Sequence, residues 1–280
     1  MGNESHNAVK YSEEFRKWSE VLGCGDPESA MLTLASSLRN ELLASRRSRK
    51  GLPVLADELA GLRGIIEFRV RNIDHTAALV IMKNGFACVL STGESRGVRR
   101  NFAVAHEIGH TEFFDISCWP PKPVLQLDLM NSRAAERLCN IFAGALLIPE
   151  EQLDSIVQAL QRDLSFTRID YLAESFHVSR EVLIRRLAES KRFSCEQECI
   201  AVLKRLQIPN AAVYTVETII PPIGSRFLLG ERTFPIGRDA AVVQALLDDK
   251  ETICHFEIKE YGSPHTGYAL AIGMIEFTDP

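Results

Sequence analysis

The sequence of 280 residues lacks any apolar run that could cross a membrane, because no stretch approaches the roughly 18 consecutive apolar residues that a transmembrane helix needs. Its N-terminal segment Met1–Lys10 is polar and has no apolar core of the kind that secretory signals carry. His6 occupies the position where a myristoylation signal has Ser or Thr. These absences predict a cytoplasmic protein without a membrane anchor.

The cysteines are too scattered for a disulfide framework. The chain has seven of them, an odd number, and contains no Cys-x-x-Cys pair. Cys195 and Cys199 lie four residues apart, a spacing that in a single pair is more typical of two small half-buried residues than of a zinc clamp. This cysteine usage indicates a reducing compartment.

Positive charge is not in excess either. The formal net charge of -5 argues against a surface that coats itself with nucleic acid, although it is compatible with a local basic patch. Hydrophobic residues make up 46% and charged residues 25% of the chain, which is the balance of an ordinary globular protein.

The first third of the chain predicts helices followed by a small antiparallel sheet. Asp26-Pro27 has the form of a helix start, and helical spacing of apolar residues continues to about Ala44. A short helix is expected from Pro53 to near Gly61. Strands are expected over Ile65–Val70, Ala78–Met82 and Phe86–Leu90, the last two joined by a hairpin turn at Asn84-Gly85.

Mainly helical patterns follow. Asn101 can cap a helix that runs to about Phe113, and a proline-rich loop then covers Asp115–Met130. Further helices are expected from Asn131 or Ser132 to Pro149, over 150–163, and as a helix-turn-helix-like pair over 168–190 with its turn at His177-Val178-Ser179.

From Cys195 onward the sequence pattern changes from mainly helical to mainly strand-like. Strands are expected over Ala212–Val216, Thr252–Ile258 and Tyr268–Phe277, with a helix over Asp239–Leu247. We therefore predict an α+β fold with a mainly helical core, a small antiparallel sheet, a helix-turn-helix-like segment and a small C-terminal α/β domain. The predicted domains are 1–165, 166–193 and 194–280.

A metal-binding pattern lies on the helix that begins near Asn101. His106, Glu107 and His110 form the motif H-E-x-x-H. Residues four apart lie almost above one another on a helix, so both imidazoles can reach one ion at roughly 2.0–2.1 Å from each nitrogen. Glu107 projects beside that ion, where it can hold a bound water as general base. The spacing predicts a zinc-dependent peptidase.

A third ligand must come from elsewhere in the chain. A metzincin has Gly and His three and six residues after the second His, but Phe113 and Ile116 stand there. Glu112 points to another side of the helix, and Asp115 lies at or past its end. The better candidate is Glu136, which shares a stripe of four-residue steps with Asn140 on the helix that Pro149 terminates. A lone helical Glu is usually a surface residue, so this prediction depends on the H-E-x-x-H motif.

Two longer patterns include these residues. They read Arg100-x-Phe102-x-x-Ala105-His106-Glu107-x-Gly109-His110 and Glu136-x-x-x-Asn140-x-Phe142-Ala143-x-x-Leu146-x-x-Pro149. Together they resemble the ImmA/IrrE family of bacterial metallopeptidases, over roughly residues 50 to 190. One departure is Cys139, where the family more often has Ala. We expect Cys139 to pack as a small apolar residue rather than join the site.

The resemblance implies the roles of the site residues. One zinc ion per chain, with manganese as an alternative, would be bound by His106, His110 and Glu136, and Glu107 would be catalytic. The resemblance further implies a regulatory endopeptidase that cleaves a helix-turn-helix repressor of the XRE type in a stress-response or mobile-element circuit. It also implies a C-terminal domain that is GAF-like in some members and could act as a sensor. We expect the substrate strand to pair with the sheet edge near Phe86–Leu90.

The alternative is a DNA-binding transcriptional regulator whose metal site is only structural. Its support is a set of basic residues on and after the second short helix of the 168–190 pair, namely Arg180, Arg185, Arg186, Lys191 and Arg192. The same window carries Asp170, Glu174, Glu181 and Glu189, so its net charge is small. Salt-dependent DNA binding would favour this alternative, and metal-dependent cleavage of a repressor would favour the peptidase.

Overall fold

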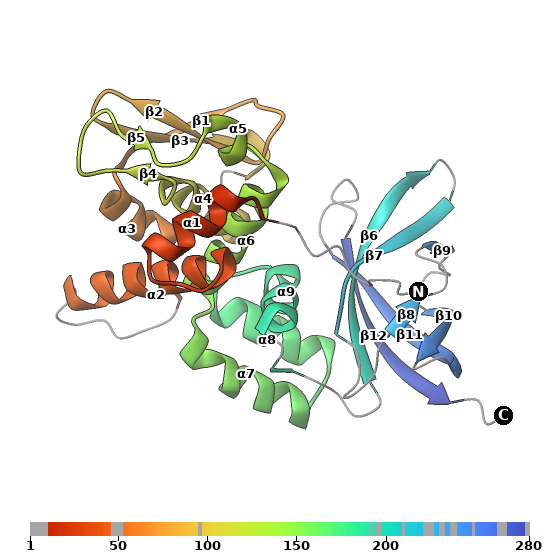
Figure 1. Cartoon of the computed structure of the whole chain (residues 1–280). Helices are drawn as coiled ribbons and strands as arrows, with labels where there is room; N and C mark the ends of the chain where they lie inside the picture. Colours follow the sequence, from red (N-terminus) through yellow and green to blue (C-terminus); the bar gives the residue numbers. More distant parts are fainter. Residues whose placement is uncertain are drawn as a thin grey trace. The chain divides into compact units, whose positions relative to one another are not determined.

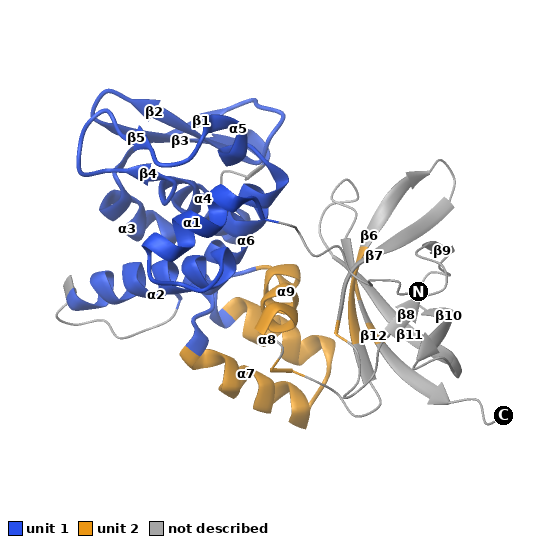
Figure 2. Ribbon diagram, viewed as in Figure 1, with its two compact units in different colours: residues 1–150, 175–178 blue, residues 151–174, 179–280 orange. Residues whose placement is uncertain are grey.

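The computed structural model describes most of the chain and divides it into two compact units. The described residues are 11–45, 53–94, 97–190, 192–193, 198–208, 211–220, 227–229, 233–235, 240–247, 250–261 and 268–277. Predictions made for Met1–Lys10, Lys191 and Cys195 lie outside these ranges. Unit 1 comprises residues 1–150 and 175–178, and unit 2 comprises 151–174 and 179–280 (Figure 2). The domain boundaries expected at residues 165 and 193 remain predictions.

Unit 1 consists of helices, a three-stranded sheet and a two-stranded ladder (Figure 1). Its helices are α1 Glu13–Val21, α2 Pro27–Ser45, α3 Ala56–Ala60, α4 Gly97–Thr111, α5 Leu127–Met130 and α6 Arg133–Leu147, with 3-10 turns at Gly61–Arg63 and Thr92–Glu94. Helix α2 begins as predicted, since Asp26 Oδ1 accepts a hydrogen bond from the Ser29 backbone N–H at 3.0 Å. Among the described residues no helix has the length and apolar character that crossing a bilayer requires.

The sheet of unit 1 contains the predicted hairpin. Strands β2 Ala77–Met82 and β3 Gly85–Ser91 pair antiparallel from Met82↔Gly85 to Ala77↔Leu90. The prediction of a purely antiparallel sheet is wrong for β1, Ile65–Arg71, which pairs parallel with β3 in the order β1-β3-β2. In the sheet, β3 lies between β1 and β2 and pairs with both of them. The alternation of apolar residues along a strand does not determine which strand is its neighbour or whether the two pair in parallel.

Helix α4 begins four residues before Asn101, so the predicted cap at this residue is wrong. Asn101 is buried inside the helix, where it ties two other segments to it. Its Oδ1 accepts from the Ala56 N–H at 2.8 Å, and its Nδ2 donates to the carbonyls of Val54 and His177 at 3.1 and 3.2 Å. A short polar side chain is thus used here as a tertiary clamp.

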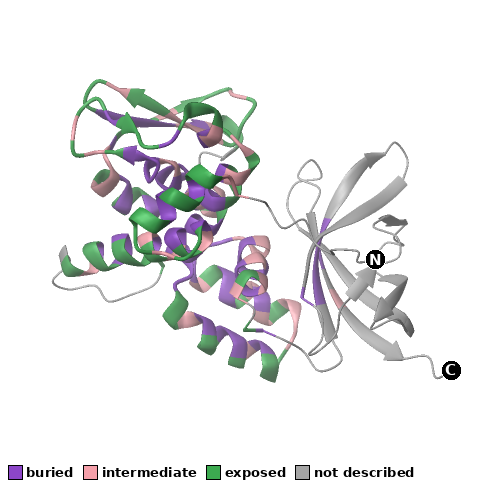
Figure 3. Ribbon diagram, viewed as in Figure 1, coloured by how far each residue is buried: buried purple, intermediate pink, exposed green. Residues whose placement is uncertain are grey.

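Helix α6 packs directly against α4. Its start is as predicted, because Ser132 Oγ accepts from the Ala135 N–H, and it ends before Pro149. Most residues of α4 from Asn101 onward and of α6 from Leu138 onward are buried (Figure 3). At the crossing, a Cβ added to Gly109 would lie 3.1 Å from Cys139 Cα. Gly109 therefore permits a closer approach of the two backbones than any other residue would allow.

The loop between α4 and α6 is not wholly irregular. Strands β4 Phe114–Asp115 and β5 Lys122–Pro123 form a two-stranded ladder within the predicted loop of 115–130. Helix α5 follows directly after it. Within the proline-rich stretch, Lys122–Pro123 is extended, as expected, whereas Trp119 and Pro120 lie in a bend and are joined by a cis peptide bond.

Unit 2 contains three helices and a large sheet. The helices are α7 Glu150–Arg162, α8 Phe166–Ser175 and α9 Arg180–Ser190. The predicted helix-turn-helix pair corresponds to α8 and α9. Ser179 Oγ accepts from the Val182 N–H at 3.2 Å and so caps the start of α9. His177, in the predicted turn, adopts a φ of 53°.

The described residues after 197 form an antiparallel sheet of seven strands, ordered β8-β10-β11-β12-β6-β7-β9. The strands are β6 Glu198–Ile208, β7 Ala211–Ile220, β8 Phe227–Leu229, β9 Thr233–Pro235, β10 Ala240–Leu247, β11 Lys250–Tyr261 and β12 Tyr268–Phe277. The helix predicted over Asp239–Leu247 is wrong, because its described residues Ala240–Leu247 pair with β11 and form β10. The predicted α+β fold class is confirmed for the described residues, but the predicted α/β character of the C-terminal domain is wrong there, because the described residues after 197 form strands and no helix.

Replacing Gly109 by Ala tests the close approach of α4 and α6. The new Cβ would meet the Cys139 backbone, so the helices must separate by a few tenths of an ångström. We expect a destabilisation of about 1–3 kcal/mol in urea unfolding, the usual effect of overpacking a core. Gly61→Ala is the matched control, because its Cβ meets nothing within 4 Å. Equal stability of the two variants would contradict this reading of the helix crossing.

Candidate metal centre

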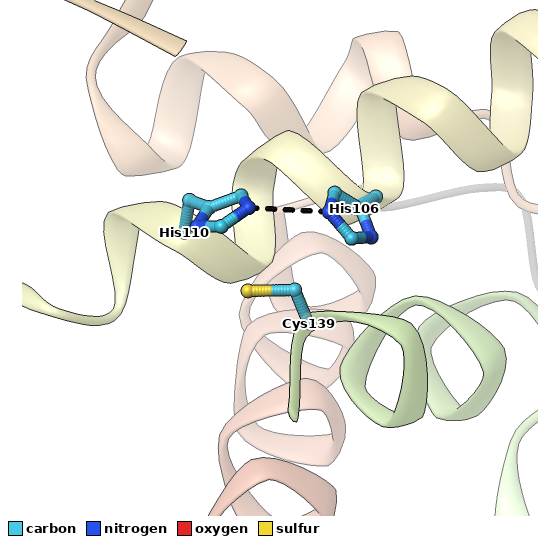
Figure 4. A group of neighbouring side chains, drawn as sticks. All are labelled: His106, His110 and Cys139. Atoms are coloured by element: carbon cyan, nitrogen blue, oxygen red, sulfur yellow. Dashed lines mark hydrogen bonds between the residues drawn. The ribbon is translucent and has the colours of Figure 1, made fainter. Parts of the chain in front are cut away.

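The two histidines of H-E-x-x-H lie on one face of α4 and point their rings toward the same place (Figure 4). His106 Nε2 and His110 Nε2 are 3.1 Å apart, and both side chains are largely buried. The four-residue spacing that predicted this arrangement is therefore confirmed as geometry. Two imidazole nitrogens at this separation form one edge of a metal-binding polyhedron.

Glu136 completes a triangle with the two imidazoles. From the first turn of α6, its Oε2 lies 3.2 Å from His106 Nε2 and its Oε1 lies 3.3 Å from His110 Nε2. Ligands bound at about 2.0–2.1 Å in a tetrahedron are about 3.3 Å from one another, from the geometry of zinc sites. Nitrogen and oxygen atoms of these three side chains thus have the spacing of ligands around one small cation.

The ionisation of these groups fits a cation site. Hydrogen bonds from His106 and His110 hold the pKa of the Glu136 carboxyl well below its ordinary value. Burial opposes protonation of His106, but its hydrogen bond to Glu136 and the nearby Glu107 charge raise its pKa overall. The cluster therefore places two carboxylates beside two imidazoles. A divalent ion would neutralise these negative charges better than protons on the imidazoles do.

Asn140 orients the first histidine. Its side chain lies one turn after Glu136 on α6, with Oδ1 2.9 Å from His106 Nδ1. An acceptor at Nδ1 fixes the tautomer that carries the proton there and leaves the Nε2 lone pair for the metal. Sequence reasoning placed Asn140 on the Glu136 stripe without assigning it this role, although the four-residue spacing was the available signal.

Glu107 lies on α4 beside the cluster and is almost fully buried, with 4% of its surface exposed. Its carboxylate interacts with the backbone of Leu79 in β2, so strand β2 runs close to this side chain. Burial raises the pKa of Glu107, and the adjacent imidazoles oppose that shift. A buried carboxylate with a raised pKa has the protonation properties of a general base.

The end of α4 is held by an ion pair. Glu112, predicted to point away from the ligand face, lies with Oε2 2.9 Å from Arg63 Nη2. Arg63 also donates to the carbonyl and hydroxyl of Thr111 at 3.2 and 3.3 Å. Asp115 is exposed and accepts from the Ser117 N–H instead. Neither carboxylate lies in the cluster that the two imidazoles form with Glu136.

Cys139 belongs to the immediate surroundings of the histidines. It is fully buried, as expected of a small apolar residue, and burial raises the pKa of its thiol well above the ordinary value. One ligand atom each from Cys139, His106 and His110 lie within 4.8 Å of one another. Figure 4 shows its side chain on the facing helix, beneath the two rings. Cys139 therefore packs in the core and at the same time lies beside the two imidazoles.

A comparison with protein families identifies this arrangement. Residues 89–188 match the family model described as the IrrE N-terminal-like domain, Peptidase_M78. This part of the chain is therefore similar to the peptidase domain of the ImmA/IrrE family. The match contains α4 and α6 entire, and it begins later than the residue 50 at which the resemblance was expected to start. No curated protein matches the chain. The predicted resemblance is confirmed over residues 89–188, and the match supports a metallopeptidase.

Asn140→Ala tests whether Asn140 orients the His106 ring. Asn140 is exposed, so its truncation should leave the fold intact. We expect zinc affinity to fall roughly 10–100-fold, as is usual when the hydrogen-bond partner of a metal-binding histidine is lost. Competition with a fluorescent chelator measures the change. Asn140→Asp, which keeps an acceptor oxygen, should retain most of the affinity. A wild-type zinc Kd in Asn140→Ala would exclude the orienting role.

Proposed function

We propose that this chain is a metallopeptidase similar to the ImmA/IrrE family, with zinc bound by His106, His110 and Glu136 and with Glu107 as general base. The observation that carries the proposal is the triangle of donor atoms with sides of 3.1, 3.2 and 3.3 Å. Imidazole and carboxylate donors at this spacing suit zinc, and they are also compatible with manganese.

When bound, zinc supplies Lewis acidity, lowering the pKa of a bound water to about 7 and polarising the substrate carbonyl. The chain's own residues then perform the proton transfers. Glu107 accepts the proton of the attacking water and donates it to the departing amine. Asn140 keeps the His106 ring in one orientation throughout. Burial of Glu107 favours its role, because a raised pKa lets the carboxyl hold the proton between the two steps.

Glu107→Gln separates metal binding from catalysis. The amide keeps the size of the side chain but cannot accept a proton, so we expect stoichiometric zinc and a fall in kcat of at least 100-fold, from the usual worth of a general base. His106→Ala should lose both zinc and cleavage. Metal analysis and cleavage of a protein substrate measure the two properties. Cleavage at the wild-type rate by Glu107→Gln would refute the assignment.

The substrate edge predicted near Phe86–Leu90 is wrong, because β3 is the central strand of its sheet. The strand whose open edge adjoins Glu107 is β2. Since the hairpin closes on Met82 and Gly85, Leu79 and Ile81 occupy positions whose backbone N–H groups face away from β3. The interaction between Leu79 and Glu107 agrees with that direction. A substrate strand paired with β2 would thus reach the general base.

Ile81→Pro removes one backbone donor from this edge without breaking the ladder to β3. We expect kcat/KM to fall roughly fivefold, through a higher KM, because one hydrogen bond is worth about 1 kcal/mol. Ile81→Ala keeps the donor and should change KM less. Steady-state cleavage of one substrate by both variants measures the difference. Equal KM values for the two variants would count against pairing along β2.

We further propose that the substrate is an XRE-type helix-turn-helix repressor in a stress-response or mobile-element circuit. This proposal rests on the resemblance of the chain to its family and on no contact within it. The direct experiment incubates the purified protein, with and without chelator, with the repressor encoded beside it. Zinc-dependent cleavage of the repressor supports the proposal. An intact repressor in an experiment where an unrelated protein is cleaved would contradict the proposed substrate but not the peptidase activity. Cytoplasmic localisation remains a prediction.

The charges of unit 2 give the DNA-binding alternative little support. Among the described basic residues of α9 and its end, Arg180 pairs with Asp170, Arg185 with Glu181, and Arg192 with Asp154, while Arg186 is buried. Guanidinium groups engaged in this way contribute less to phosphate binding than free ones. A sensor role for residues 194–280 stays a prediction, testable by whether their removal changes regulation while zinc is retained.

A further inference from the structure

Two structural elements flank the paired histidines of α4 from opposite sides. On one side Glu107 interacts with the backbone of Leu79 in β2. On the other side Gly109 lies against Cys139 of α6. Residues two apart on a helix of 3.6 residues per turn point in nearly opposite directions, so β2 and α6 lie on opposite flanks of the histidines. A peptide that lies over the histidines therefore has β2 along one edge and α6 along the other.

An extended peptide carries polar backbone groups along both of its edges. Pairing with β2 satisfies the N–H and C=O groups of one edge only. The carbonyls of the second edge then face α6, and backbone carbonyls that leave water need a hydrogen-bond donor. The α6 side of the site is thus the place where such a donor would contribute to substrate binding.

Asn140 on α6 has a donor group in this position. Binding of a metal through His106 Nε2 requires the imidazole proton on Nδ1, which then donates to Asn140 Oδ1 at 2.9 Å. This contact fixes which end of the amide faces the ring, and the Nδ2 group points elsewhere. Among the described residues none accepts a hydrogen bond from Asn140 Nδ2, and the side chain is exposed. Its two N–H donors are therefore open to a ligand.

The position of this amide suits a carbonyl close to the scissile bond. Only the imidazole ring and the 2.9 Å hydrogen bond separate the amide from His106 Nε2. Carbonyls on one edge of a strand recur every second residue, about 6.4–6.8 Å apart, so a range of this order spans two substrate residues. Glu136, the other exposed α6 side chain beside the imidazoles, can only accept hydrogen bonds when ionised. Of these two side chains, Asn140 alone can donate to a peptide carbonyl.

We propose that Asn140 is a substrate-binding residue whose Nδ2 donates to a main-chain carbonyl on the edge of the peptide that faces away from β2. The inference rests on the proposed metal site and on pairing along β2, and it leaves the coordination position for the attacking water open. The amide orients His106 through its oxygen and holds the peptide through its nitrogen. Because the contact is made to the backbone, it selects extended segments rather than a particular side chain.

Hydroxamates separate peptide binding from metal binding. Acetohydroxamate reaches only the metal, whereas a tripeptide hydroxamate adds main-chain carbonyls. Two tripeptide hydroxamates, with the metal-binding group at the N- or the C-terminal end, cover both sides of the scissile bond. Isothermal titration of the zinc-loaded, full-length protein gives each Kd. The ratio of the tripeptide Kd to the acetohydroxamate Kd isolates the backbone contacts and cancels any change in binding to the metal.

Asn140→Asp is the decisive variant, because it keeps an oxygen for His106 but replaces the N–H donors with a second oxygen. We expect zinc to be retained and the Kd ratio of at least one tripeptide to rise by roughly fivefold or more, the usual effect of losing one hydrogen bond. Asn131→Asp makes the same exchange at an exposed position before α6 and should leave both ratios unchanged. Unchanged ratios in zinc-loaded Asn140→Asp would overturn the proposal.

The same titrations distinguish this proposal from those on which it rests. A wild-type protein that binds neither zinc nor acetohydroxamate would refute the metal site itself. A ratio that rises in Ile81→Pro but not in Asn140→Asp would leave pairing along β2 standing and overturn the contact with Asn140. Asn140→Ala, which removes both the acceptor and the donors, should weaken zinc binding and raise the ratio together. A ratio unchanged in Asn140→Ala would likewise count against the proposal.

Discussion

The close crossing of α4 and α6 is the constraint on which the site depends. The imidazoles come from α4 and the carboxylate from α6, so donor distances near 3.3 Å require the two helix axes to approach closely. Gly109 allows this, since it presents no side chain to Cys139. Around the crossing, apolar residues of both helices are buried and resist separation. The metal geometry is thus a consequence of backbone packing rather than of flexible side chains finding an ion.

The same packing creates an electrostatic problem that the site resolves locally. Burial raises the pKa of Glu107, because an ionised carboxylate is poorly solvated there. Glu136 avoids that penalty by remaining half-exposed and hydrogen-bonded to both imidazoles. Burial likewise raises the pKa of Glu112 to about 7, although Arg63 opposes this shift. The three carboxylates on and beside α4 therefore have three environments, and only the one beside the imidazoles and β2 is suited to transfer protons.

Local periodicity explains which parts were predictable. The H-E-x-x-H spacing, the Glu136 stripe and the hairpin at Asn84-Gly85 are set by repeats of a few residues, and the structure contains all three. What failed depends on distant partners. The parallel pairing of β1, the strand state of Ala240–Leu247 and the clamp made by Asn101 are each decided by contacts with other segments of the chain. Helix propensity in an Ala- and Leu-rich run is too weak to outweigh a full ladder of strand hydrogen bonds.

Cys139 marks the limit of what local sequence patterns determine. On α6 a small residue is needed at this position because the α4 backbone passes at Gly109, and Ala would meet that need as well as Cys. Packing alone therefore does not distinguish the two. The difference lies in the sulfur, which the crossing directs to within 4.8 Å of both imidazole donors. The helix–helix distance, which no local pattern encodes, decides how close the side chain at this position lies to the imidazoles.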